Sequence, residues 1–185
     1  MGEQPDTRSD EELMDAYVAG DAAAFRALFD RHAAVLYRLA RRRLSSDDDA
    51  RDIVQQTLLQ VHRARNDFRR GAKLRPWLFT IAMNLVREHY RKHQRRREQP
   101  LESAPAAAEP AEESEESDRV RERAARVRAA LASLPDSQRE VIELHWFDNS
   151  PYDEIALIVG ASVAAVRVRA HRGYERLRQI LPELE

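Results

Sequence analysis

Residues 66–97 read NDFRRGAKLRPWLFTIAMNLVREHYRKHQRRR, and this stretch joins a short basic loop to a long segment with helical periodicity. Apolar residues recur along that segment at the spacing of an α-helix, a pattern typical of a helix side that is buried in a core. These residues are Leu74, Leu78, Ile81, Ala82 and Leu85. The stretch therefore predicts one long amphipathic helix preceded by a loop.

The opposite side of this helix is polar and mostly cationic. It carries Thr80, Asn84, Arg87, Arg91 and Arg95, and the loop adds further cations beside aromatic Phe68 and Trp77. Cations at this spacing can follow a phosphate backbone, and rings beside them can stack on the bases of partly opened nucleic acid. An ordinary amphipathic helix with a solvated outer side is the alternative, and both rings also fit a core.

Composition favours an all-α chain of one medium or two small domains. Of the 185 residues, 43% are hydrophobic and 34% charged, with five glycines and an abundance of Ala, Leu, Arg and Glu. The absence of cysteine excludes disulfides and thiolate chemistry. Since no apolar run approaches the roughly 20 residues of a membrane span, and the N-terminus does not resemble a signal peptide, we expect a soluble cytoplasmic protein.

Helix signals divide the first half of the chain into four segments. Ser9 and Glu12 form a capping box, Asp21 is a candidate N-cap, and a third helix is expected over about 47–65. With the long helix already described, these segments predict a four-helix unit over residues 9–97.

Residues 98–118, EQPLESAPAAAEPAEESEESD, differ sharply from their surroundings. They contain eight acidic residues, three prolines and neither Lys nor Arg, so they predict a disordered, flexible acidic linker. In the free protein this linker either occupies a basic surface or acts only as a spacer.

The last third of the chain predicts a helix-turn-helix. A helix is expected from Arg119 to Leu134, and Asp136 or Ser137 caps the next one. In the segment that follows, Ser150 is expected to cap a short helix with Pro151 at its first position, and Gly160 to end it in a left-handed turn. Ser162 then caps a second helix, which in this motif enters the major groove.

That second helix has two distinct sides. We expect the following residues to be buried: Val163, Val166, Ala170, Gly173 and Leu177. The opposite side carries Ala164, Val168 and His171, flanked by Arg167 and Arg172, with Arg169 and Arg176 to the side. Arginine can bind guanine edges or phosphates, and valine can contact a thymine methyl group. A plain helical hairpin with solvated arginines is the alternative.

No metal site, cofactor or catalytic site is predicted. His89 and His93 have the spacing of a helical metal chelate, but no third ligand is apparent near them in the sequence, and arginines surround them. The motifs of phosphate loops, zinc proteases and nucleophile elbows are absent, so nothing indicates an enzyme.

Three segments together resemble a known family. They are DDARDIVQQTLLQVHRARNDF (48–68), LRPWLFTIAMNLVREHYRKHQRR (74–96) and LPDSQREVIELHWFDNSPYDEIALIVGASVAAVRVRAHRGYERLR (134–178). In order and spacing the chain is similar to bacterial RNA polymerase sigma factors of the sigma-70 family, in the extracytoplasmic-function group. The resemblance implies a region 2 domain at 9–97 and a helix-turn-helix region 4 domain at 119–184. It implies binding to core RNA polymerase and to double-stranded and melted promoter DNA, with an anti-sigma factor as a candidate partner.

The resemblance also assigns residues to each contact. For polymerase binding it implies Asp52, Gln55, Gln56 and Leu59. For the −10 element, read and melted by residues 66–95, it implies Asn66, Arg69, Arg70, Lys73, Arg75, Trp77, Asn84, Arg87 and Arg91. For the −35 element, read by the helix at 163–178, it implies Ala164, Arg167, Val168, Arg169, His171 and Arg172.

The chain departs from the family pattern at three positions, two of which belong to these sets. The family usually has Glu at Gln56, a small hydroxyl residue at Val168 and Ala at Gly173, so Val168 indicates an altered −35 preference. The competing hypothesis is a stand-alone helix-turn-helix regulator whose N-terminal helices dimerise or bind a ligand. That hypothesis gives no reason for the basic, aromatic stretch at 66–97.

Overall fold

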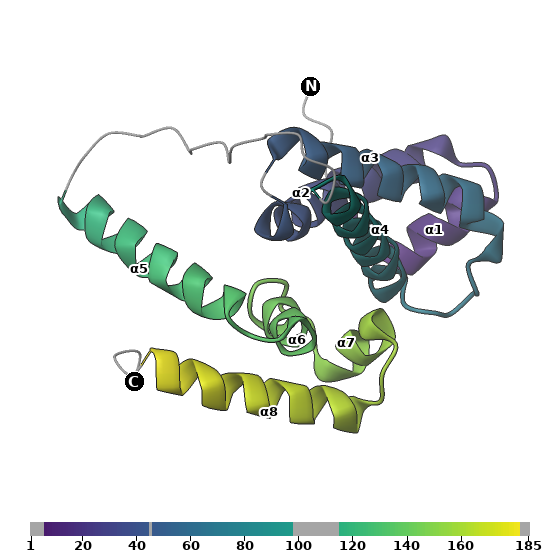
Figure 1. Ribbon diagram of the computed structural model, residues 1–185. Coiled ribbons are helices and arrows are strands. Elements are labelled where there is room, and N and C mark those ends of the chain that lie inside the picture. The colour runs from purple at the N-terminus through teal and green to yellow at the C-terminus, as the bar shows by residue number, and fades with distance from the viewer. Residues whose placement is uncertain (1–5, 45, 98–114, 182–185) are drawn as a thin grey trace. The chain divides into compact units, whose positions relative to one another are not determined.

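The computed structural model describes residues 6–44, 46–97 and 115–181, with side chains for all of these except 94–97, 115–118 and 120. The chain divides into two compact units, Met1–Ala106 and Ala107–Glu185. Every regular element in the described part is a helix, which confirms the predicted all-α class (Figure 1). Among these residues, no helix combines the length and apolar content needed to cross a bilayer.

The first unit consists of α1 (Asp10–Val18), α2 (Ala22–Arg43), α3 (Asp47–Ala64), the 3-10 helix η1 (Arg65–Asp67) and α4 (Leu74–Arg97). Its helix starts follow the sequence signals closely. Ser9 and Glu12 form the predicted capping box, and the Asp21 carboxylate accepts hydrogen bonds from the first amides of α2. Ser46 caps α3, whose first turn holds three aspartates where the helix dipole favours them.

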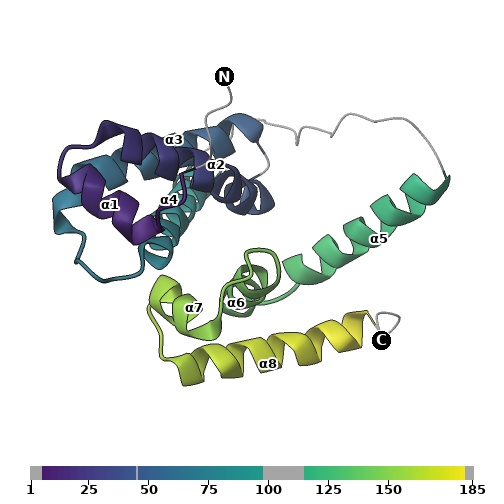
Figure 2. The ribbon, with the colours of Figure 1, turned by 180° about the vertical axis from the view of Figure 1, so that it is seen from behind.

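Helix α4 is the core element of this unit, since it contacts α1, α2 and α3 (Figures 1 and 2). Four of the five apolar residues predicted to be buried are buried, and Ile81 is partly buried. The buried side is wider than predicted, because Phe79, Met83 and Val86 are also buried. A helix that packs against three neighbours buries more of its circumference than one lying on a single surface.

Polar contacts between distant residues complete the unit. The backbone N–H of Leu74, at the start of α4, donates to the Glu11 carboxylate of α1 at 3.0 Å. The buried His32 ring contacts Asp10 at 2.8 Å, and Arg31 donates to the same carboxylate at 2.6 Å. Helix α1 is thus fixed to both α2 and α4.

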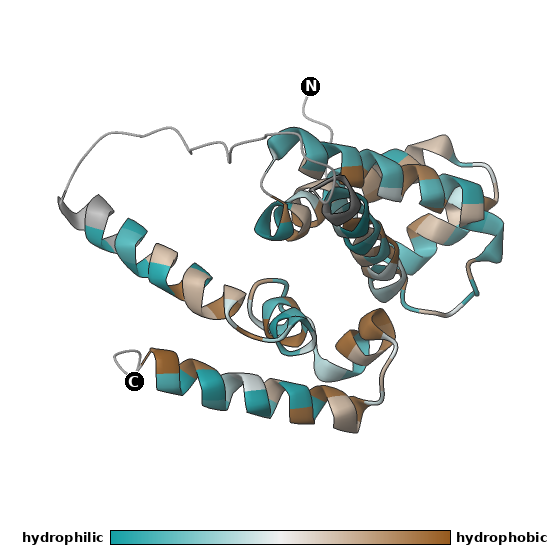
Figure 3. Ribbon diagram, viewed as in Figure 1, coloured by the Kyte–Doolittle hydropathy of each residue, from teal (hydrophilic) through white to brown (hydrophobic). Residues whose placement is uncertain are grey.

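The second unit consists of α5 (Glu115–Ala132), α6 (Asp136–Trp146), α7 (Tyr152–Val159) and α8 (Val163–Ile180). Helix α5 begins at Glu115, four residues earlier than the predicted start at Arg119. Residues 98–114 of the expected linker lie outside the described residues. Apolar positions recur along α8 between hydrophilic ones (Figure 3).

Two predicted caps in this unit are wrong by one position. Pro135 and Pro151, both with extended ψ, are the N-cap residues of α6 and α7, and neither helix has a side-chain cap. Asp136 and Tyr152 are therefore the first helical residues. The predicted turn between α7 and α8 is confirmed: Gly160 has φ of 64° in the left-handed region, and Ser162 caps α8.

The close packing of α6 on α8 explains the glycine at position 173. A Cβ atom there would lie 2.5 Å from Cδ1 of Ile142, well inside van der Waals contact. Val166 and Ala170 are buried along the same side of α8, and Leu177 is partly buried, as predicted. Val163, predicted to be buried, is 36% exposed, because it lies in the first turn of the helix.

Candidate nucleic-acid and protein interfaces

The loop before α4 presents cations to solvent. Gly71, with φ of 79°, takes the left-handed conformation that this turn requires, and the Ala72 amide donates to the Arg69 carbonyl at 3.0 Å. Arg69, Arg70 and Lys73 are exposed. The loop therefore extends its cationic groups outward beside the start of α4.

Two aromatic rings connect this loop to α4. The ring centroids of Phe68 and Trp77 lie 5.2 Å apart at an interplanar angle of 47°, and both side chains are half-buried. Each ring therefore packs on the other while keeping part of its surface in solvent. The sequence left open whether these rings are core residues or a stacking surface. Each ring is partly buried against the other and partly exposed, so each alternative describes part of its surface.

The polar side of α4 continues away from the loop. Asn84 and Arg91 are exposed, and the half-buried Arg87 donates to the Asn84 amide oxygen at 2.9 Å. The half-buried Arg75 lies with its guanidinium 4.7 Å from the centre of the Phe79 ring. Asn66 is exposed in η1, so every residue predicted for this surface has an exposed or half-exposed side chain. The Arg95 side chain lies outside the described residues.

Helix α3 presents a separate face of mixed chemistry. Asp52, Gln55, Gln56 and Leu59 are all exposed and recur at the three- and four-residue spacing that groups side chains on one face. Leu59 is 45% exposed, while Ile53, Val54, Leu58 and Val61 are buried on the other side of the helix. This face therefore combines polar side chains with one apolar side chain, Leu59, at its end.

The outer face of α8 matches the prediction at most positions. Ala164, Arg167, Val168, His171 and Arg172 are exposed, with Val168 at 48%, and Arg169 is half-buried. The residues of this face come from the second helix of a helix-turn-helix. A face of arginines around an exposed valine can bind phosphates and base edges in a major groove.

A third ligand lies beside the two histidines of α4, so the expectation from sequence that none is near them is wrong. One ligand atom from each of Asp49, His89 and His93 lies within 4.8 Å of the others. The aspartate lies on α3, 40 residues before His89, so the spacing of the sequence gives no sign of it.

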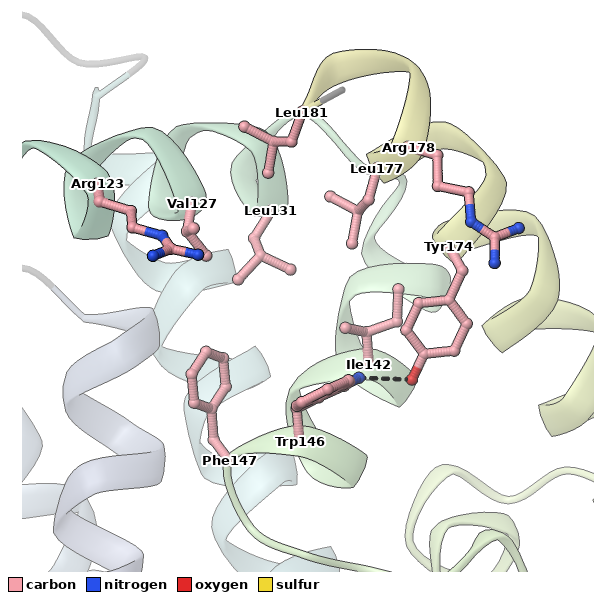
Figure 4. A pocket seen from close by; sticks show the side chains of 10 residues that line it. All are labelled: Arg123, Val127, Leu131, Ile142, Trp146, Phe147, Tyr174, Leu177, Arg178 and Leu181. Carbon is pink, nitrogen blue, oxygen red and sulfur yellow. Dashed lines mark hydrogen bonds between the residues drawn. The ribbon is translucent and has the colours of Figure 1, made fainter. Parts of the chain in front are cut away.

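The second unit also contains an apolar cavity of about 730 Å³ between α5, α6 and α8 (Figure 4). Leu131, Ile142 and Leu177 line it, and the Trp146 indole N–H donates to the Tyr174 hydroxyl at 2.8 Å. Trp146 and Phe147 are 68% and 51% exposed. Because its lining residues come from three helices, no local sequence pattern indicates this cavity.

Comparison with protein families gives two matches in chain order. The family model described as Sigma-70 region 2 matches residues 28–96, and Sigma-70, region 4 matches residues 124–177. RNA polymerase sigma factor CarQ of Myxococcus xanthus is 35% identical over 93% of this chain and 97% of its own length. ECF RNA polymerase sigma factor SigM of Mycobacterium tuberculosis is 33% identical over 94% of this chain and 85% of its own length.

Two solved structures are similar over most of the chain. CnrH in complex with the cytosolic domain of CnrY has a TM-score of 0.72 and 28% identity, covering 95% of this chain and 99% of that chain. The sigma factor RpoE in complex with the anti-sigma factor NepR from Bartonella quintana has a TM-score of 0.66 and 26% identity. It covers 87% of this chain and 98% of that chain.

Proposed function

The chain belongs to the sigma-70 family of RNA polymerase sigma factors, in its extracytoplasmic-function group, and from this premise we propose how its parts divide the work of promoter-specific transcription initiation. Residues 9–97 bind core RNA polymerase and handle the −10 element. Residues 119–184 read the −35 element. Residues 98–118 tether the two, so that polymerase fixes their spacing and each weak DNA contact strengthens the other.

We propose that the exposed face of α3 binds core polymerase. Asp52, Gln55 and Gln56 offer one carboxylate and two amides, and Leu59 offers an apolar contact at the end of the same face. Gln56 replaces the acid that the family usually has there, so this contact rests on a hydrogen bond and not on an ion pair. The observation that supports this proposal is that all four predicted side chains are exposed on one face of α3, with Leu59 45% exposed.

The −10 element is assigned to the loop and the polar side of α4. Exposed Arg69, Arg70 and Lys73 supply cations for the phosphates of the separated strands, and Asn84 and Arg91 extend the contact along the helix. The Phe68–Trp77 pair lies where the loop meets the helix and offers rings on which an unpaired base can stack.

The −35 element is assigned to the outer face of α8. Arg167, Arg169 and Arg172 supply guanidinium groups for phosphates and guanine edges, and Val168 faces outward as the apolar contact. His171 contributes a further polar group on this face.

We further infer that the protein acts in the cytoplasm, as a binding factor and not as an enzyme. Members of this family are DNA-binding initiation factors, and their action requires polymerase and chromosomal DNA in one compartment. An anti-sigma factor is a candidate regulator, since one similar solved sigma factor is bound to an anti-sigma factor. The stand-alone regulator is disfavoured, because such a protein has no use for a region 2 unit.

Competition for core polymerase tests the proposal. The full-length chain should co-purify with core polymerase and lose that binding when a second sigma factor is added in excess. Leu59→Asp should weaken binding at least tenfold, by placing a charge in an apolar contact. Val18→Asp, a matched change at a residue that is 37% exposed on α1, should leave it unchanged. Full binding by Leu59→Asp would show that the α3 face is not the contact.

A further inference from the structure

The crossing of α3 and α4 brings together three groups that commonly bind metals. We propose that Asp49, His89 and His93 form a binding site for a divalent transition-metal ion of the zinc class. The site would tie the first turn of α3 to the C-terminal half of α4. This inference is independent of the proposed function, since it concerns only the first unit and its ion.

The distance between the ligand atoms of His89 and Asp49 suits a shared metal ion better than a direct hydrogen bond. Nε2 of His89 lies 3.5 Å from Oδ2 of Asp49. That is longer than the ~2.9 Å of an ordinary N–H···O bond. It is close to the ~3.3 Å between two ligand atoms of one tetrahedral zinc ion, which follows from bonds of about 2.0–2.1 Å.

The second histidine completes a chelate along α4. His89 and His93 are one helical turn apart, and their ring centroids are separated by 4.4 Å at an interplanar angle of 32°. One ring nitrogen of His93 lies within 4.8 Å of the ligand atoms of His89 and Asp49, and the His93 side chain is exposed. The backbone of Asp49 is held in the first turn of α3, because its N–H donates to the Ser46 hydroxyl at 3.2 Å.

The charges around the cluster are compatible with a cation. Burial lowers the pKa of His89 below its ordinary value of 6.5. The negative charges of Asp49 and Asp52 oppose this shift, whereas His93 and Lys92 add to it. The Asp49 and Asp52 carboxylates place negative charge near His89. The Lys92 ammonium is already paired with Glu88 at 2.8 Å, which offsets its charge.

The ligand set indicates the class of ion. Two imidazoles and one carboxylate are borderline ligands that suit zinc and its neighbours, whereas calcium and magnesium prefer oxygen alone. With three protein ligands, the fourth position of a tetrahedral ion goes to water. Bound only by the folded unit, the ion would stabilise the packing of α3 on α4 by mass action.

Zinc titration of the full-length protein tests the site. After removal of bound metal with a chelator, ZnCl2 should bind at one equivalent near neutral pH, by calorimetry. Free Zn²⁺ at 100 times Kd should raise the Tm of the first unit by about 10–20 °C. Co²⁺, as a spectroscopic probe, should give the visible absorption of a four-coordinate ion.

Three variants localise the binding. His93→Gln and Asp49→Asn should each weaken Zn²⁺ binding about tenfold or more, because each removes one of three ligands. Neither side chain is buried, so both variants should fold, with unchanged helical circular dichroism. Asp30→Asn, a matched change at an exposed aspartate of α2, should bind as the wild type does. Equal binding by Asp49→Asn and the wild type, or no saturable binding by the wild type, would overturn the proposal.

Discussion

The ring of Trp77 lies 5.2 Å from that of Phe68, centroid to centroid, and this tilted contact joins the basic loop to the first turn of α4. Such a pair contributes about 0.5–1.5 kcal/mol beyond the burial of its surface. A double-mutant cycle of Phe68→Leu and Trp77→Leu, followed by urea denaturation, should therefore give a coupling free energy of that size. Strict additivity of the two substitutions would show that the rings do not support each other.

The loop cations should determine the salt dependence of DNA binding. Removing Arg69 or Arg70 should lower the slope of log K against log salt concentration by about 0.7–0.9, the value for one phosphate contact. The measurement is anisotropy of labelled −10 DNA with a single-stranded segment, bound to the protein in complex with core polymerase. Arg26→Ala, at an exposed arginine of α2, is the control and should leave the slope unchanged. Equal slopes for all variants would remove the loop from the DNA surface.

We expect Val168 on α8 to determine part of the sequence preference at the −35 element. Val168 is 48% exposed on the outer face of α8, where its methyl groups can contact a thymine methyl group. Val168→Ser should change the preferred base at one position of a randomised −35 library, while total affinity changes by less than about tenfold. The readout is sequencing of the bound fraction. An unchanged preference would mean that Val168 touches no base.

The Asp10 carboxylate should make the stability of the first unit dependent on pH. Burial alone would raise the pKa of Asp10, but its hydrogen bonds and charge interactions with His32 and Arg31 outweigh burial and lower the pKa below the ordinary 3.8. Because the folded pKa is depressed, this contribution is full above about pH 4 and is lost as pH falls through the folded value.

Asp10→Asn should therefore reduce the free energy of unfolding by about 1–3 kcal/mol at pH 7, the range for hydrogen bonds to charged groups. Urea denaturation at pH 7 and pH 3 should show the difference from wild type shrinking at the lower pH. Asp30→Asn, at an exposed aspartate of α2, should change stability by less than about 0.5 kcal/mol. A cost for Asp10→Asn that is independent of pH would contradict the assignment.

Local signals in the sequence were sufficient for most of the fold. Ser9, Asp21 and Ser162 each bond to amides within three residues, so short patterns identify them. The same holds for Gly160, whose left-handed turn requires little beyond its own backbone freedom. The error at Pro151 arises because proline fits both the N-cap and the first helical position. At Pro135 the polar side chains of Asp136 and Ser137 suggested a cap, but α6 has no side-chain cap.

Features formed by residues far apart in the sequence could not be predicted from such local patterns. Glu11 caps α4 from another helix, and Asp49 meets His89 only because α3 and α4 cross. The burial of Met83 depends on how many helices surround α4, which periodicity alone does not reveal. The apolar cavity of the second unit likewise requires three helices at once.

Reconstituted transcription is the measurement that tests the central claim most directly. The full-length chain, added to core polymerase and a library of genomic promoter fragments, should produce run-off transcripts from a limited set of start sites. Core polymerase alone should give none of them, Leu59→Asp should give few, and Val18→Asp should match the wild type. A chain that binds promoter DNA without core polymerase, and on which no transcript depends, would contradict its role as a promoter-specificity subunit.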